Sequence, residues 1–261
     1  MRLKIDVDLD YHFPKAAEVL LTLEVAQLPD QILIEDLLTV NGSGPLHPIT
    51  GEDGIGRRTW TATEGAFHAR YTATVDVERT AVPLENLACD PLDALPPEVV
   101  PYLWPSRYCE ADKFEAFVEK QFDGLEGGAL VAAMSAWVRT EMAYVAGSSD
   151  TETTAADAFV SRQGVCRDYA HLLASFARAA SIPARLVSAY AWQLQPPDFH
   201  AVVEVWLDGA WRLVDPTGLA PIEGMARIAV GRDATDIAFM TIFGTAEMKA
   251  QRITVMRDDV R

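Results

Sequence analysis

The sequence Arg162-Gln-Gly-Val-Cys-Arg-Asp-Tyr-Ala-His-Leu-Leu-Ala-Ser-Phe-Ala-Arg-Ala-Ala-Ser-Ile-Pro-Ala-Arg185 organises the chain, because it predicts a buried helix that begins at a cysteine. Cys166 lies about one turn before an apolar stripe with helical spacing, which is typical of a helix with one face in a core. Gly164 permits a tight bend before the cysteine, and Ser181-Ile-Pro183 ends the helix. The stripe consists of Tyr169, Leu172, Leu173, Phe176, Ala177 and Ala180.

A cysteine in the first turn of a helix faces free backbone N–H groups and the positive end of the helix macrodipole, and both favour the thiolate. The macrodipole contributes roughly 0.3–1 kcal/mol, less than the about 1.36 kcal/mol that corresponds to one pKa unit. An ordinary thiol, with a pKa near ~8.5, therefore stays mostly protonated at neutral pH without a further cation. A nucleophilic Cys166 requires a partner such as an imidazolium.

A predicted hairpin supplies that partner. Its strands cover 200–207 and 210–217, and Asp208-Gly209 between them is the strongest short signal for a hairpin turn. A two-residue turn makes His200 and Asp215 diagonal neighbours on one face, about 7–8 Å apart at the backbone. A carboxylate beside an imidazole orients the ring and stabilises its charged form.

The chain therefore offers a nucleophile, Cys166, a base, His200, and an orienting acid, Asp215, in this order along the sequence. A lone cysteine at a helix start is more often a small buried hydrophobe. The predicted placement of His200 and Asp215 favours the catalytic interpretation over that alternative.

Three motifs in this order resemble those of the bacterial transglutaminase-like superfamily, distant relatives of papain-like proteases. They are Gly164-Val-Cys-Arg-Asp-Tyr-Ala-His171, Phe199-His-Ala-Val-Val-Glu-Val205 and Val214-Asp-Pro-Thr217. The resemblance extends to Trp104-Pro-Ser-Arg-Tyr108 and Val230-Gly-Arg-Asp233, and to the β-rich first third of the chain. It is specific for the catalytic apparatus and not for the substrate.

The resemblance implies acyl transfer on peptide or protein amides through a thioester at Cys166, with His200 moving the proton and Asp215 orienting His200. Water as the acceptor would make the protein a cysteine peptidase or amidase, and an amine would make it a transglutaminase. The backbone N–H of Cys166 is one candidate oxyanion donor. For the second donor the sequence leaves open Gln163 and an aromatic residue, either Tyr144 or Trp137.

Two other classes of function stay open. The first is a catalytically silent fold of this family that acts as a binding or scaffold module. An unreactive Cys166 would favour this alternative. The second is a redox-sensing thiol, which is disfavoured because no resolving cysteine lies nearby in the sequence.

The expected fold class is α+β, in three segments. Residues 1–82 contain short alternating stretches, with separate strands expected at 57–61 and 67–78, and predict an N-terminal antiparallel β-sandwich. Residues 83–108 hold six prolines and are expected to form an extended linker that packs on both halves. Residues 109–261 are expected to form the papain-like or transglutaminase-like core, with helices packed on an antiparallel sheet.

Composition limits the partners. The 261 residues carry a net charge of −16 without a basic run, which disfavours nucleic acid and anionic membranes and hints at neutral or basic peptide substrates. The start of the chain lacks the apolar run of a signal peptide. The odd number of cysteines (Cys89, Cys109 and Cys166) fits reduced thiols in a bacterial cytoplasm. The oligomeric state is left open.

No cofactor or metal is expected, because the five histidines and three cysteines show no metal-ligand spacing. His171 lies about 140° around the helix from Cys166, so it cannot share its face and is expected to be structural. The acidic pair Asp258-Asp259 is expected to be a solvated tail.

Overall fold

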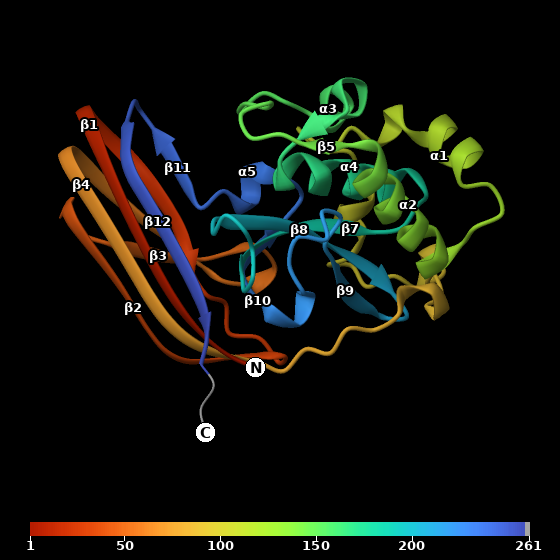
Figure 1. The fold of residues 1–261 in the computed structure, drawn as a ribbon, viewed down its shortest axis with the longest axis horizontal. Coiled ribbons are helices and arrows are strands. Elements are labelled where there is room, and N and C mark those ends of the chain that lie inside the picture. Colours follow the sequence, from red (N-terminus) through yellow and green to blue (C-terminus); the bar gives the residue numbers. More distant parts are fainter. Residues whose placement is uncertain (259–261) are drawn as a thin grey trace.

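Two long antiparallel strands form the centre of the N-terminal sheet in the computed structural model, which describes residues 1–258 (Figure 1). They are β1 (Arg2–Glu24) and β4 (Arg57–Val77). Apolar residues alternate with polar ones along the first half of β1, so that one face is buried and the other is open to solvent. β2 (Gln31–Ser43) and β3 (His47–Thr50) pair with β4, whereas β11 (Met240–Phe243) and β12 (Glu247–Arg257) pair with β1.

The N-terminal region is β-rich, as expected, but its strands form one six-stranded sheet and not a sandwich of two. The expectation of separate strands at 57–61 and 67–78 is wrong, because Glu64 and Gly65 continue the strand. The register shifts between Phe13 and Ala17, opposite Gly65 and Thr63. Pro14 and Gly65 therefore mark a bulge at which both strands continue, and not a turn.

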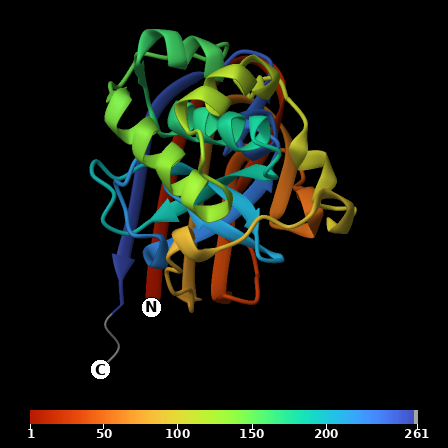
Figure 2. The same ribbon diagram turned by 90° about the vertical axis from the view of Figure 1, so that its right-hand side faces the viewer.

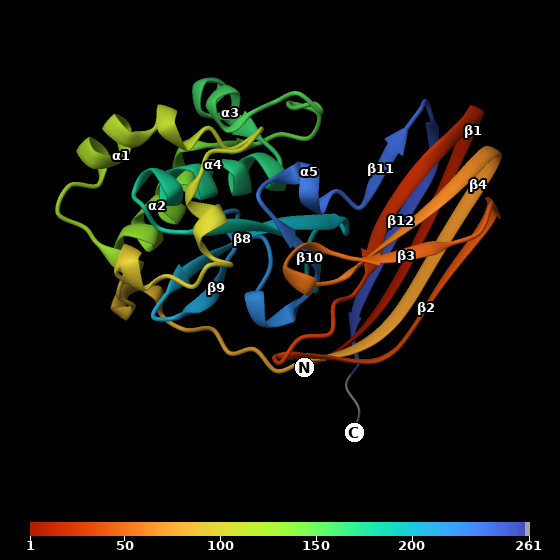
Figure 3. The same cartoon turned by 180° about the vertical axis from the view of Figure 1, so that it is seen from behind.

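The second lobe is a four-stranded antiparallel sheet in the order β10-β7-β8-β9, covered by helices. Figure 2 views it from the helical side, and Figure 3 shows from behind that β8 and β10 lie between the helices and the N-terminal sheet. The helices packed on this antiparallel sheet confirm the fold expected for the transglutaminase-like core. The elements are α1 (Glu115–Gln121), α2 (Gly127–Glu141), β5 (Ala143–Tyr144), α3 (Ala155–Ser161), β6 (Gln163–Gly164), α4 (Cys166–Ala179), β7 (Ala184–Ala191), β8 (Phe199–Leu207), β9 (Ala210–Val214), β10 (Met225–Gly231) and α5 (Ala234–Ile237).

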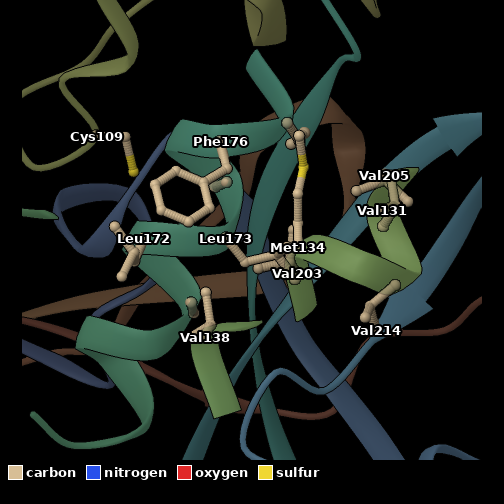
Figure 4. Close-up of a cluster of buried hydrophobic side chains, with 14 of the residues drawn as sticks. Cys109, Val131, Met134, Val138, Leu172, Leu173, Phe176, Val203, Val205 and Val214 are labelled. Atoms are coloured by element: carbon tan, nitrogen blue, oxygen red, sulfur yellow. The ribbon is translucent and has the colours of Figure 1, made fainter. Parts of the chain in front are cut away.

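The helix that begins at Cys166 is fixed by packing. Leu172, Leu173 and Phe176 of α4 are fully buried, and they lie in one cluster with side chains of α2 and β8 (Figure 4). Burying a side chain of this size contributes roughly 1.5–3 kcal/mol to the stability of the fold. This packing holds the helix that begins at Cys166 in a fixed position. The partners from α2 and β8 are Val131, Met134, Val138, Val203 and Val205.

The segment 83–108 is irregular chain with short 3-10 turns at Leu84–Asn86, Leu92–Ala94 and Val100–Leu103. The Tyr102 hydroxyl donates to Asp53 of the N-terminal region at 2.6 Å, and Leu87 accepts from the Gly128 N–H of α2 at 2.8 Å. The segment therefore packs on both lobes, as expected.

The two ends of the chain meet in the N-terminal sheet. Because β11 and β12 pair with β1, the last strands of the segment expected as the core, 109–261, complete the sheet of the first segment. Asp258 forms an ion pair with Lys4 at 3.1 Å and is not simply a solvated tail, while Asp259 lies outside the described residues. Among residues 1–258, no helix combines the length and apolar character needed to cross a membrane.

A buried ionic network joins the lobes. Glu204 of β8 is fully buried and accepts hydrogen bonds from Arg185, at 2.8 Å, and from Arg227. Arg185 also pairs with Asp53 at 2.8 Å, and Arg227 pairs with Asp30. Burial alone would raise the pKa of Glu204, but the two guanidinium groups outweigh it and lower the pKa, so the carboxylate is charged.

Glu204→Ala is expected to lower the free energy of unfolding by about 3–5 kcal/mol, because it leaves two buried arginines without their shared carboxylate. Denaturant unfolding measures the change. The exposed Glu119→Ala in α1 is the control and is expected to stay within about 0.5 kcal/mol of the wild type. A loss for Glu204→Ala no larger than the control's would show that the network does not hold the lobes together.

Candidate active site

α4 begins at Cys166 because the preceding residues are held in a tight bend. The Asp168 carboxylate accepts the Val165 N–H at 2.8 Å and so closes the first turn. A Cβ at Gly164 would lie 2.6 Å from the Asp168 Cβ, so this close approach requires glycine. Cys166 is left partly exposed at the helix start, with free helical N–H groups around it.

The hairpin has the predicted register. Leu207 pairs with Ala210 across Asp208-Gly209, whose φ angles of 52° and 66° fit a tight two-residue turn. His200 and Asp215 therefore meet on one face. Asp215 Oδ2 lies 3.0 Å from His200 Nε2.

The Asp215 carboxylate is held in place by the chain that follows it. Its Oδ1 accepts the Thr217 N–H at 2.9 Å and the Thr217 hydroxyl at 2.7 Å. These bonds fix the carboxylate, which in turn fixes the imidazole. Because the ring Nε2–H donates to the carboxylate, Nδ1 is the ring nitrogen available to the thiol.

The sulfur of Cys166 lies at the start of β8, beside that imidazole. It is 4.0 Å from the carbonyl oxygen of Phe199, the residue before His200. The His200 side chain is fully buried, and its Nδ1 has no hydrogen-bond partner by ordinary distance and angle among residues 1–258. The structure thus brings the three predicted residues together.

The charges of the trio support one another. Burial alone would lower the pKa of His200, but the Asp215 carboxylate and the Cys166 sulfur outweigh it and raise the pKa to about 9. Burial alone would raise the pKa of Asp215, but hydrogen bonds from His200 and Thr217 hold it below its ordinary value. At neutral pH the arrangement is an imidazolium beside a carboxylate.

Tyr144 is a functional candidate that sequence reasoning could not single out. β5 runs parallel to β6, with Tyr144 opposite Gly164, and its hydroxyl interacts with the backbone N–H and the sulfur of Cys166. Burial, and then the charge of Cys166, raise the pKa of Tyr144 to about 12, so the hydroxyl keeps its proton and can donate it in a hydrogen bond. β5 and β6 have only two residues each, which is too short to leave a periodic pattern in the sequence. Their pairing, which places Tyr144 beside Cys166, could therefore not be predicted.

The other two candidates for the second oxyanion donor are placed less well. Trp137 packs among aromatic rings, with the Arg162 guanidinium over its face, and belongs to the core. Gln163 is exposed on β6, and its side chain forms no hydrogen bond with Cys166 among residues 1–258. The geometry favours Tyr144.

His171 is buried and structural, as expected. Its Nε2 accepts the Ala234 N–H at 3.1 Å, and its ring stacks on Tyr108 with 5.2 Å between centroids. Burial lowers the pKa of His171 to about 3, so the ring stays neutral. Cys109 is fully buried and Cys89 is exposed, and both are free thiols.

A group of possible metal ligands lies far from this site, on the N-terminal sheet. One ligand atom each of Asp8, Asp10 and His68 lies within 4.8 Å of the others. Neighbouring strands bring these residues together, so spacing along the chain does not reveal them. Asp8 is already close to His68, at 3.2 Å, and to Arg252, at 3.7 Å.

Comparisons with known proteins show which family and which solved structure this chain resembles. The model of the "Transglutaminase-like superfamily" matches residues 116–216, which include Cys166, His200 and Asp215. The crystal structure of a "putative cysteine protease" from Cytophaga hutchinsonii is 34% identical to this chain, with a TM-score of 0.92 over 100% of this chain and 92% of that one.

Two further similarities are more limited. An uncharacterized protein of Mycobacterium leprae is 32% identical over 146 residues, which span 52% of this chain and about half (52%) of that protein. The periplasmic domain of TgpA from Pseudomonas aeruginosa is 19% identical, with a TM-score of 0.44 over 82% of this chain and 77% of that one.

Proposed function

Because the chain belongs to the transglutaminase-like superfamily, we propose that it is an enzyme that transfers acyl groups from peptide or protein amides through a thioester on Cys166. The observation that carries the proposal is the convergence of three side chains from α4, β8 and the end of β9. The Cys166 sulfur adjoins the His200 ring, and Asp215 holds the other side of that ring at 3.0 Å.

In the first half-reaction the Cys166 thiolate attacks the carbonyl carbon of the amide, and the carbonyl π electrons move to the oxygen. The oxyanion accepts hydrogen bonds from the Cys166 N–H and the Tyr144 hydroxyl. The C–N bond then breaks, and His200 gives its proton to the leaving amine. The products are a thioester and a neutral imidazole.

In the second half-reaction the neutral His200 takes a proton from the acceptor as the acceptor attacks the thioester. Water yields a carboxylic acid and an amine yields a new amide. The thiolate leaves, which restores the thiolate–imidazolium pair. Asp215 remains ionised throughout and stabilises the imidazolium in both halves.

The test is to trap the acyl-enzyme from a library of peptides and to locate it by mass spectrometry, with and without a primary amine. The proposal expects the acyl group on the peptide that contains Cys166, and its absence in Cys166→Ala. The amine shows whether water or an amine completes the reaction. Processing of peptides by Cys166→Ala at the wild-type rate would overturn the proposal.

The pH profile has a predicted alkaline limb. Because the pKa of His200 is raised to about 9, the imidazolium is present below that pH and is lost as the pH rises through it. The value of kcat/KM is therefore expected to fall above about pH 9, with a slope that corresponds to one proton. Initial rates between pH 6 and pH 10, with stability checked at each pH, measure the limb; a fall centred near the ordinary histidine pKa of ~6.5 would contradict the assignment.

Tyr144→Phe is expected to lower kcat by roughly 10- to 1000-fold, because it removes one oxyanion donor and keeps the ring. KM should change little, since the donor acts mainly in the transition state. The matched control is Tyr11→Phe on β1 of the N-terminal sheet. It also removes one phenolic hydroxyl, and kcat is expected to stay unchanged. An unchanged kcat in Tyr144→Phe would remove Tyr144 from the oxyanion hole.

A further inference from the structure

The carboxylate of Asp198 lies at the candidate site but takes no part in the trio. It precedes Phe199, whose carbonyl oxygen is 4.0 Å from the Cys166 sulfur. Its negative charge interacts electrostatically with the His200 imidazole and with the Tyr144 hydroxyl. Because these two groups flank Cys166, the Asp198 carboxylate lies near the place where a substrate would sit.

Both lobes hold this carboxylate in place. Oδ1 of Asp198 accepts the Phe199 N–H at 2.7 Å and the side-chain amide of Gln251 at 2.8 Å. Gln251 belongs to β12, so the N-terminal sheet contacts the loop that precedes β8 (Figure 1). Oδ2 makes no hydrogen bond within residues 1–258, and the residue is exposed.

No lysine or arginine among residues 1–258 forms an ion pair with Asp198, in contrast to Asp6, Asp30 and Asp76. Although the residue as a whole is exposed, its neighbours partly desolvate the carboxylate, and this desolvation raises its pKa. A fixed carboxylate that is partly desolvated and pairs with no lysine or arginine favours a cation from outside the chain.

We propose that Asp198 selects substrates that carry an ammonium or guanidinium group beside the reacting acyl group. The inference rests on the proposed function, since it concerns the same site. The cation has two possible sources, a basic side chain of the acyl donor or the far end of a cationic amine acceptor. Both would place a positive group against the free Oδ2 of Asp198.

The first test compares alkylation of Cys166 by 2-bromoethylammonium and by neutral iodoacetamide, so it needs no knowledge of the substrate. Asp198→Asn is expected to lower the ratio of the two rate constants by roughly 3- to 10-fold, as a loss of one nearby charge would. Glu119→Gln removes the same charge from the exposed face of α1 and should leave the ratio unchanged.

The outcomes separate the two proposals. Slow reaction of wild-type Cys166 with iodoacetamide, no faster than an ordinary exposed thiol, would defeat the proposed function. Fast reaction with a ratio that Asp198→Asn leaves unchanged would overturn the role of Asp198 alone. If Asp198→Asn changed both rate constants by the same factor, the role of Asp198 would also be overturned. Such a change would mean that Asp198 acts on His200 and does not distinguish reagents by their charge.

The second test distinguishes the sources of the cation. The p-nitrophenyl esters of acetyl-lysine and acetyl-norleucine differ by one terminal ammonium on the acyl donor, and putrescine and butylamine differ by one on the acceptor. A preference for the charged member of either pair, expressed in kcat/KM and lost in Asp198→Asn, supports the proposal and identifies the source. No preference in either pair overturns it.

Discussion

Near neutral pH, Cys166 is expected to react with iodoacetamide at least about 10-fold faster than Cys89 and Cys109, and His200→Ala is expected to remove the difference from the exposed Cys89. An ordinary thiol is only about 3% ionised at pH 7, so ionisation by an imidazolium raises its reactivity by up to roughly 30-fold. Burial raises the pKa of Cys109 to about 11 and also raises the pKa of Cys89, so both stay protonated.

Mass spectrometry of peptides after timed labelling measures the three rates separately. His47→Ala is the control, since His47 is exposed on β3 and should leave the selectivity intact. Circular dichroism shows whether His200→Ala is folded. Equal labelling of the three cysteines in the wild type, or full selectivity in folded His200→Ala, would contradict the activation of Cys166 by His200.

The second large effect concerns Asp215. Asp215→Ala is expected to lower kcat/KM by roughly 10²- to 10⁴-fold, because His200 loses both its orientation and the charge that stabilises its imidazolium. Asp215→Asn should retain more activity, since the amide oxygen can still accept from Nε2–H and hold the ring. Both changes should shift the alkaline limb below about pH 9, because each removes the negative charge.

Steady-state kinetics on the trapped substrate measures these losses. Asp208→Asn removes one carboxylate from the exposed hairpin turn and is expected to leave kcat/KM unchanged. If Asp215→Ala retained wild-type activity and a limb near pH 9, Asp215 would not act through His200.

The positions of Cys166, His200 and Asp215 could be predicted because short stretches of the sequence determine them. Asp208-Gly209 fixes a two-residue turn, the turn fixes the register, and the register places His200 beside Asp215. The helical stripe after Cys166 likewise predicts where α4 begins. Each of these inferences spans fewer than about twenty residues, within which backbone geometry leaves few alternatives.

Long-range arrangements could not be predicted in this way. The pairing of β12 with β1 joins residues at opposite ends of the chain, and no local pattern signals it. Pro14 and Gly65 are residue types common in turns, and only the pairing of β1 with β4 shows that they lie at a bulge. The contact between Gln251 and Asp198 depends on both lobes. The peptide or protein substrate, the lack of nucleic-acid and membrane partners and the cytoplasmic location stay predictions.

The central claim is that the Cys166 sulfur, the His200 ring and the Asp215 carboxylate form one ionic unit. An NMR titration of the labelled His200 imidazole, before and after methylthiolation of Cys166, tests it most directly. The account predicts a pKa near about 9 in the free protein and a lower pKa once the sulfur is blocked, because blocking removes the negative charge of the thiolate. A titration near ~6.5 that methylthiolation leaves unchanged would contradict it.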